Sequence, residues 1–139
     1  MPQFKTVLGF DFGTRRIGVS IGQRVTRTAQ PLLTLQTDEE GATPWQRIEA
    51  LIKEWQPDRL VVGLPYNEAF NDQSTYQAAL SFIEMLKSKF NIPVDTIDEH
   101  LSSFAAKAIM RERGIKPNKV PLDAMAATII LESWLNTHE

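Results

Sequence analysis

Apolar residues gather in short continuous runs in the first part of the chain. Residues 5–11 and 17–22 form two such runs, and a third, 25–35, follows after a short polar turn. Nearly continuous apolar runs of this length are typical of strands buried on both faces, and the short turns predict an antiparallel meander. Two later runs, 59–65 ("RLVVGLP") and 92–99 ("IPVDTIDE"), predict two further strands.

Four other segments have the apolar spacing of helices. They are residues 44–56, 74–90, 102–114 and 122–136, and the third is expected to end at Gly114. In the first helix the spacing predicts that both tryptophans are core residues, in the stripe Trp45, Ile48, Leu51, Ile52 and Trp55. In the second it predicts a packing stripe that ends with Lys87 at its edge: Tyr76, Leu80, Ile83 and Leu86.

The order of these elements predicts an α/β fold with a mixed five-stranded sheet flanked by helices. Three antiparallel strands come first, and two later strands lie parallel to the first because helical crossovers join them. The chain contains no internal repeat or linker, so residues 1–139 are expected to form a single domain. Ligand sites in such sheets collect beyond the carboxyl ends of the parallel strands, which here read "GFDFG", "VGLPYN" and "TIDEHLSS".

The composition narrows the possible functions. The chain has no cysteine, which excludes disulfides and thiolate metal sites. It has no apolar run long enough to cross a bilayer and no signal-peptide pattern, so a cytoplasmic protein is expected. The net charge is −2, yet residues 1–36 carry five basic residues against one acidic residue, and residues 105–120 carry five against one. These two patches could bind a polyanion, or they could belong to an ordinary solvated surface.

Acidic residues mark the sheet edge where a ligand is expected. Asp11 closes the first strand, Asp98 and Glu99 close the last, and Asp123 begins the final helix. Oxygen donors without cysteine or paired histidines favour Mg²⁺ or Mn²⁺ over zinc. Two such ions about 4 Å apart are a common arrangement for attack of water on a phosphodiester.

Each acid also has a structural explanation. Asp11 could form an Asx turn ahead of Gly13. Asp98 or Glu99 could cap the helix that follows, and Asp123 could favour the N-terminus of its own helix. The metal-site hypothesis depends on their coincidence at one edge of the sheet.

Four blocks in order, together with "KEWQPD", resemble one family along essentially the whole chain. The blocks "FDFGTRRIGVSIG", "RLVVGLPYN", "DEHLSS" and "VPLDAMAATIILESWL" are similar to those of YqgF or RuvX proteins, small nucleases related to Holliday junction resolvases. The resemblance implies an RNase H-like fold, a divalent-metal nuclease site, and trimming of the small-subunit ribosomal RNA precursor at its 5′ end. It implies Asp11, Glu99 and Asp123 as catalytic and metal-binding residues, with Asp98 in a supporting role.

The expected substrate-binding residues surround these acids. Three residues, Thr14, Arg15 and Arg16, lie in the turn after Asp11. They could bind a phosphate, or they could be ordinary solvent-exposed turn residues. Asn67 follows the fourth strand. Where the resembled family usually has arginine, this chain has His100, which is only partly charged at neutral pH, so it either holds phosphate less tightly or is an exposed loop residue.

Three alternatives to an RNA-processing nuclease stay open. One is a Holliday junction resolvase-like DNA endonuclease, and another is a non-catalytic RNA-binding assembly factor. A third is an actin-like or sugar-kinase-like nucleotide site, although no second phosphate loop accompanies the first aspartate-glycine turn. RNA, in the form of pre-16S rRNA, is the expected partner, and the sequence leaves a monomer or a homodimer open.

Overall fold

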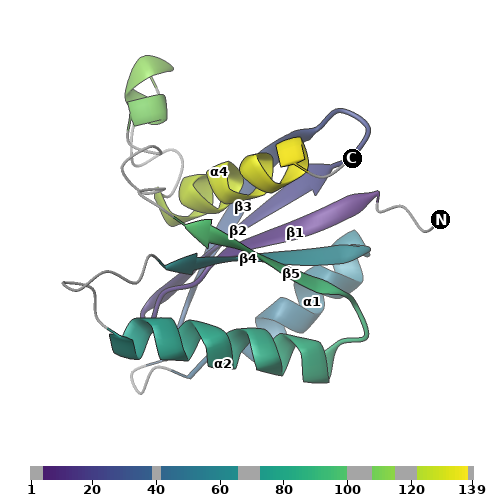
Figure 1. The fold of residues 1–139 in the computed structure, drawn as a ribbon, viewed down its shortest axis with the longest axis vertical. Coiled ribbons are helices and arrows are strands. Elements are labelled where there is room, and N and C mark those ends of the chain that lie inside the picture. The colour runs from purple at the N-terminus through teal and green to yellow at the C-terminus, as the bar shows by residue number, and fades with distance from the viewer. Residues whose placement is uncertain (1–4, 39–41, 66–72, 100–107, 115–121, 138–139) are drawn as a thin grey trace.

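A five-stranded sheet forms the centre of the computed structural model, which describes residues 5–38, 42–65, 73–99, 108–114 and 122–137 (Figure 1). The strands are β1 (Thr6–Asp11), β2 (Arg16–Gln23), β3 (Thr28–Gln36), β4 (Arg59–Pro65) and β5 (Val94–Glu99). Their order across the sheet is β3-β2-β1-β4-β5.

The sheet topology confirms the predicted mixed arrangement. β1, β2 and β3 pair antiparallel as a meander, β4 lies parallel to β1, and β5 lies parallel to β4. The third strand begins at Thr28 and not at residue 25, because residues 24–27 form the turn between β2 and β3. Within that turn Arg27 has a positive φ of 54°.

Helices cover both faces of the sheet (Figure 1). On one face lie α1 (Trp45–Trp55) and α2 (Gln73–Lys89), and on the other lies α4 (Leu122–Thr137). Leu8 and Phe10 of β1 pack with α1 and α2, whereas Val7 packs with α4. Because strand side chains alternate, Asp11 has the same parity as Val7 and falls on the α4 face.

The packing of α2 corrects the predicted stripe. Its buried residues are Ala79, Phe82, Ile83 and Leu86. Tyr76 and Leu80 are half-buried, so the prediction is right at Ile83 and Leu86 and wrong about the centre of the stripe. The cause is Phe82, whose ring contacts the rings of Phe10, Phe12 and Trp45 and turns α2 toward them.

The two tryptophans of α1 differ in their surroundings. Trp45 stacks on Phe82, with ring centroids 5.5 Å apart, as expected of a residue that packs on the core. Trp55 is 36% exposed, so its predicted place in the core is wrong. It lies in the last turn of the helix, which ends at the left-handed residue Gln56, at the edge of the packed layer.

The C-terminal elements agree with the pattern where they are described. α4 matches the predicted helix 122–136 within one residue. Of the predicted helix 102–114, the structure describes residues 108–114. Residues 108–112 are helical, and a turn follows that contains Gly114, whose φ is +68°. None of the helices in the described ranges has the length and hydropathy that crossing a bilayer requires.

A polar cluster ties α4 to β4 and β5. One carboxylate oxygen of Asp95 lies 3.2 Å from both a guanidinium nitrogen of Arg59 and the indole nitrogen of Trp134. Asp95→Asn is expected to cost about 1 kcal/mol, because the amide replaces a charged acceptor, and to lower the melting temperature by about 3 °C. An unchanged melting temperature in thermal denaturation would mean that the cluster does not stabilise the fold.

Candidate active site

Asp11 is a buried carboxylate at the carboxyl end of β1. Its residue is 8% exposed. In the sheet it is paired with Gly18 of β2 on one side and with Gly63 of β4 on the other. Because Gly18 has no side chain, the main chain of another element can approach the sheet directly beside Asp11 on the face that α4 covers.

Asp123, which is distant from Asp11 in the sequence, lies near the carboxyl end of β1. It lies in the first turn of α4, and a Cβ added at Gly18 would overlap the main-chain carbonyl oxygen of Asp123. The first turn of α4 therefore rests directly on the strand residue that is paired with Asp11. The structure thus places the main chain of Asp123 next to the strand residue that neighbours Asp11 in the sheet.

The remaining predicted site residues are described in part or not at all. Glu99 is the last residue of β5 and its backbone is paired with Pro65 at the same edge of the sheet, but its side chain lies outside the described part. Asn67 and His100 also lie outside the described residues. Thr14 is exposed in the turn after β1, and its carbonyl accepts a hydrogen bond from the Thr37 hydroxyl at 2.9 Å.

An ion pair joins the turn to α4. The Nε of Arg16 lies 2.8 Å from Oδ2 of Asp123, and the two side chains are 57% and 28% exposed. Arg16 is the first residue of β2, so this contact links the start of β2 to the start of α4. A predicted phosphate-binding residue is therefore paired with a predicted metal ligand.

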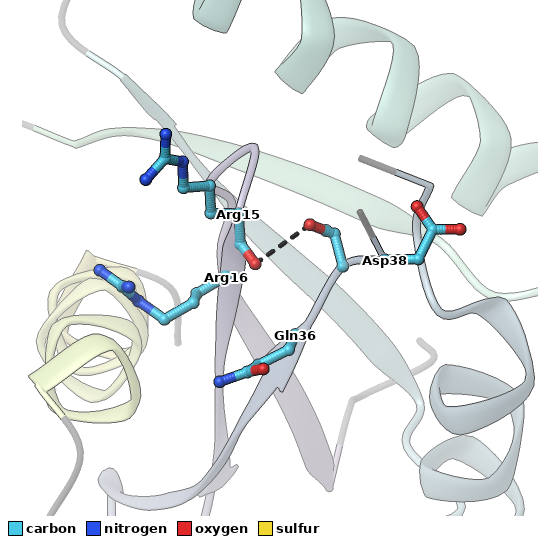
Figure 2. A pocket seen from close by; sticks show the side chains of 5 residues that line it. Arg15, Arg16, Gln36 and Asp38 are labelled. Carbon is cyan, nitrogen blue, oxygen red and sulfur yellow. Dashed lines mark hydrogen bonds between the residues drawn. The ribbon is translucent and has the colours of Figure 1, made fainter. Parts of the chain in front are cut away.

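An open depression of about 430 Å³ adjoins this pair. It is lined by Arg15, Arg16, Gln36, Thr37 and Asp38. Figure 2 shows the side chains of Arg15 and Arg16 extending to one side, with Arg16 directed toward α4, while the Asp38 carboxylate points away from them. Two arginines line the depression, and one of them is paired with Asp123. The other charged lining residue, Asp38, is directed away from them, so this side of the depression suits a ligand that carries phosphate.

The last three residues of this lining were missed by sequence reasoning. The predicted third strand ends at residue 35, one residue before Gln36, which is the last residue of β3 in the structure. Arg16 and Gln36 are direct partners in the antiparallel pair of β2 and β3, a long-range register that the local sequence pattern does not indicate. The main-chain N–H of Thr37 extends this pairing by donating to the Arg15 carbonyl at 3.0 Å.

The donor groups at this edge of the sheet are carboxylate oxygens. Among the side chains that the structure describes, no group of three or more histidine, cysteine, aspartate or glutamate residues is placed to hold a metal ion. Asp11 and Asp123 supply two carboxylates, and the position of Glu99 at the end of β5 would bring a third. Hard oxygen donors of this kind fit Mg²⁺ or Mn²⁺.

Known proteins resemble this chain along most of its length. A family model described as "RuvX: Holliday junction resolvase" matches residues 5–137. A Pseudomonas aeruginosa protein (strain UCBPP-PA14) is 45% identical over 136 residues, which cover 96% of this chain and 94% of the relative. An Actinobacillus pleuropneumoniae protein (serotype 5b, strain L20) is 46% identical over 134 residues, covering 94% and 96%. Both relatives carry the name "Putative pre-16S rRNA nuclease".

Two solved structures that share the fold are Holliday junction resolvases. RuvC of T. thermophilus in complex with a Holliday junction substrate superposes with a TM-score of 0.62 at 16% identity, covering 95% of this chain and 94% of that chain. The fowlpox virus Holliday junction resolvase gives a TM-score of 0.59 at 14% identity, covering 96% and 99%. At such low identity the likeness establishes the fold, which is RNase H-like.

Proposed function

This chain belongs to the RuvX family, and from that premise we propose that it is a metal-dependent nuclease that trims the 5′ end of pre-16S ribosomal RNA in the cytoplasm. The family match over residues 5–137 and the names of the relatives support hydrolysis of phosphodiester bonds. The same match disfavours the actin-like nucleotide site that the first aspartate-glycine turn also suggested.

The observation that carries the proposal is the meeting of Asp11 and Asp123 at the carboxyl edge of the sheet, across Gly18. We propose Glu99 as the third acid, on the family resemblance and on its place at the end of β5. When bound, Mg²⁺ or Mn²⁺ would stabilise charge on the attacking and leaving oxygens. The role of the three side chains is to hold the cation and to fix its position on the rigid end of the sheet.

The basic residues around the depression would bind the nucleic acid. Arg15 and Arg16 offer guanidinium donors to backbone phosphates, and the turn at Thr14 offers main-chain N–H groups. Asn67 and His100 complete the proposed contacts. These groups recognise phosphate in RNA and DNA alike, so the preference for RNA rests on the names of the relatives.

One set of assays tests the proposed function. Labelled RNA spanning the 5′ leader of 16S rRNA and a four-way DNA junction are incubated with the protein in Mg²⁺, Mn²⁺ or chelator, beside an ATP hydrolysis assay. We expect metal-dependent cleavage of the RNA leader. Symmetric cleavage of the junction by a dimer would favour the resolvase alternative, and RNA binding without cleavage would favour the non-catalytic assembly factor.

Removing Arg15 and Arg16 together is expected to weaken RNA binding about tenfold at low salt. Each lost phosphate contact should also reduce the slope of log affinity against log salt by roughly 0.7 for a single strand. Fluorescence anisotropy of labelled RNA in chelator measures both quantities. Arg47→Ala, an exposed arginine on α1 across the sheet from α4, is the matched control. An affinity that does not depend on salt, or an equal loss in the control, would contradict the assignment.

A further inference from the structure

The contact between Arg16 and Asp123 is a direct, accessible ion pair. Nε and Oδ2 are 2.8 Å apart, the distance of a charge-assisted hydrogen bond. The Arg16 side chain is 57% exposed and that of Asp123 is 28% exposed, so solvent and ligands can reach both partners. Exposed pairs of this kind are weak and exchange readily with other charged groups.

This pair is in conflict with the proposed role of Asp123. A carboxylate that binds a divalent cation must offer its oxygens to the metal, and a guanidinium at hydrogen-bond distance repels the metal charge. The first turn of α4 packs directly on β2 at Gly18, where an added Cβ would overlap main-chain atoms of Asp123, so the Asp123 carboxylate is anchored to a packed main chain. The Arg16 side chain is the more exposed of the two and is the one that can leave.

The Arg16 guanidinium can also bind a ligand in the adjacent depression. It lines the depression together with Arg15, Gln36, Thr37 and Asp38, whose carboxylate points away from the two arginines (Figure 2). Within the described residues its guanidinium holds Asp123 through Nε alone, so this is not the two-pronged geometry that makes an arginine-carboxylate pair strong. The planar group is well suited to a phosphate, which can accept two parallel hydrogen bonds from it.

We propose that Arg16 is an exchangeable countercation of Asp123. It neutralises the carboxylate while no metal is bound, gives way to the divalent cation, and then binds a backbone phosphate of the nucleic acid in the depression. The proposal rests on the proposed function and adds a coupling between its two ligands. Because the metal frees Arg16 for phosphate, metal and nucleic acid each strengthen the binding of the other.

The test measures Mn²⁺ affinity in the absence of nucleic acid. Free Mn²⁺ is titrated by electron paramagnetic resonance against the full chain, its Arg16→Gln and Arg16→Lys variants, and Arg15→Gln. The last variant removes the same charge from the adjacent residue and controls for the general field of the arginines. We expect Arg16→Gln to bind Mn²⁺ about two- to fivefold more tightly than both the unchanged chain and Arg15→Gln. Arg16→Lys, which keeps the charge, should stay near the unchanged chain.

The other outcomes distinguish the exchange of Arg16 from the metal site itself. Weaker Mn²⁺ binding by Arg16→Gln would show that Arg16 positions Asp123 for the metal, and would overturn the exchange. Equal Mn²⁺ affinities of Arg16→Gln and Arg15→Gln would mean that the loss of any nearby positive charge has the same effect. This result would also overturn the proposed exchange. Absence of Mn²⁺ binding to the unchanged chain would overturn the metal site of the proposed function together with the exchange.

Discussion

Asp11→Asn is expected to lower the rate of RNA cleavage by on the order of a thousandfold in Mg²⁺. The carboxylate is held at the end of β1, next to the start of α4, and an amide donates one less charge to a metal ion. A loss of about 4 kcal/mol in transition-state stabilisation corresponds to this factor. The measurement is single-turnover cleavage of the labelled RNA leader at saturating protein.

The control is the same substitution elsewhere on the α4 face of the sheet. Asp95 contacts Trp134 of α4 and lies four residues before the carboxyl end of β5. Asp95→Asn is expected to cleave within about twofold of the unchanged protein at temperatures below its melting transition. If Asp11→Asn also cleaved at the unchanged rate, Asp11 would be a turn-forming residue and not a metal ligand.

Gly18→Ala should destabilise the protein more than Asp95→Asn or Gly22→Ala. The added Cβ would overlap main-chain atoms of Asp123, and a backbone cannot move aside as a side-chain tip can. Overpacking of this kind is expected to cost on the order of 3 kcal/mol, and to lower the melting temperature by roughly 10 °C. It should also displace Asp123 from Asp11, so cleavage should fall at least tenfold at temperatures where the variant remains folded.

Gly22→Ala provides the matched control on the same strand and the same face. Its Cβ would lie 2.9 Å from Cδ2 of Leu131 and 3.1 Å from Cδ1 of Leu135, which are ends of flexible side chains. These can adjust, so the loss of stability should be about 1 kcal/mol and cleavage should be nearly unchanged. Equal melting temperatures for the two variants would contradict the close contact of α4 at Gly18.

The sheet could be predicted from the sequence because its strands are short apolar runs with clear ends. Topology followed from the turn lengths and from the helical crossovers, which leave few arrangements. The orientation of α2 could not be predicted, since helical spacing fits both the stripe through Tyr76 and Leu80 and the one through Phe82. The choice between them depends on the rings of Phe10, Phe12 and Trp45, which come from other elements.

Only part of the candidate site could be predicted from the sequence. The rule that ligands gather at the carboxyl ends of parallel strands pointed to Asp11, and the chain order allowed Asp123 to return beside it. No local sequence pattern predicts that Arg16 pairs with Asp123 or that Gln36 lines the depression beside them. Both facts depend on the register of β2 with β3 and on the close approach of α4, which are long-range properties of the fold.

The melting temperature of the protein and of Asp11→Asn, each in chelator and in Mg²⁺, tests most directly whether Asp11 belongs to a divalent-metal site. Arg16 neutralises Asp123 in the metal-free protein, but burial of the Asp11 carboxylate still costs stability, so in chelator the variant should melt at or above the unchanged protein. Added Mg²⁺ should then raise the melting temperature of the unchanged protein more than that of the variant, because a ligand stabilises the state that binds it. A lower melting temperature of the variant in chelator, with an equal response to Mg²⁺ in both proteins, would contradict the metal site and leave Asp11 as a residue that forms the turn.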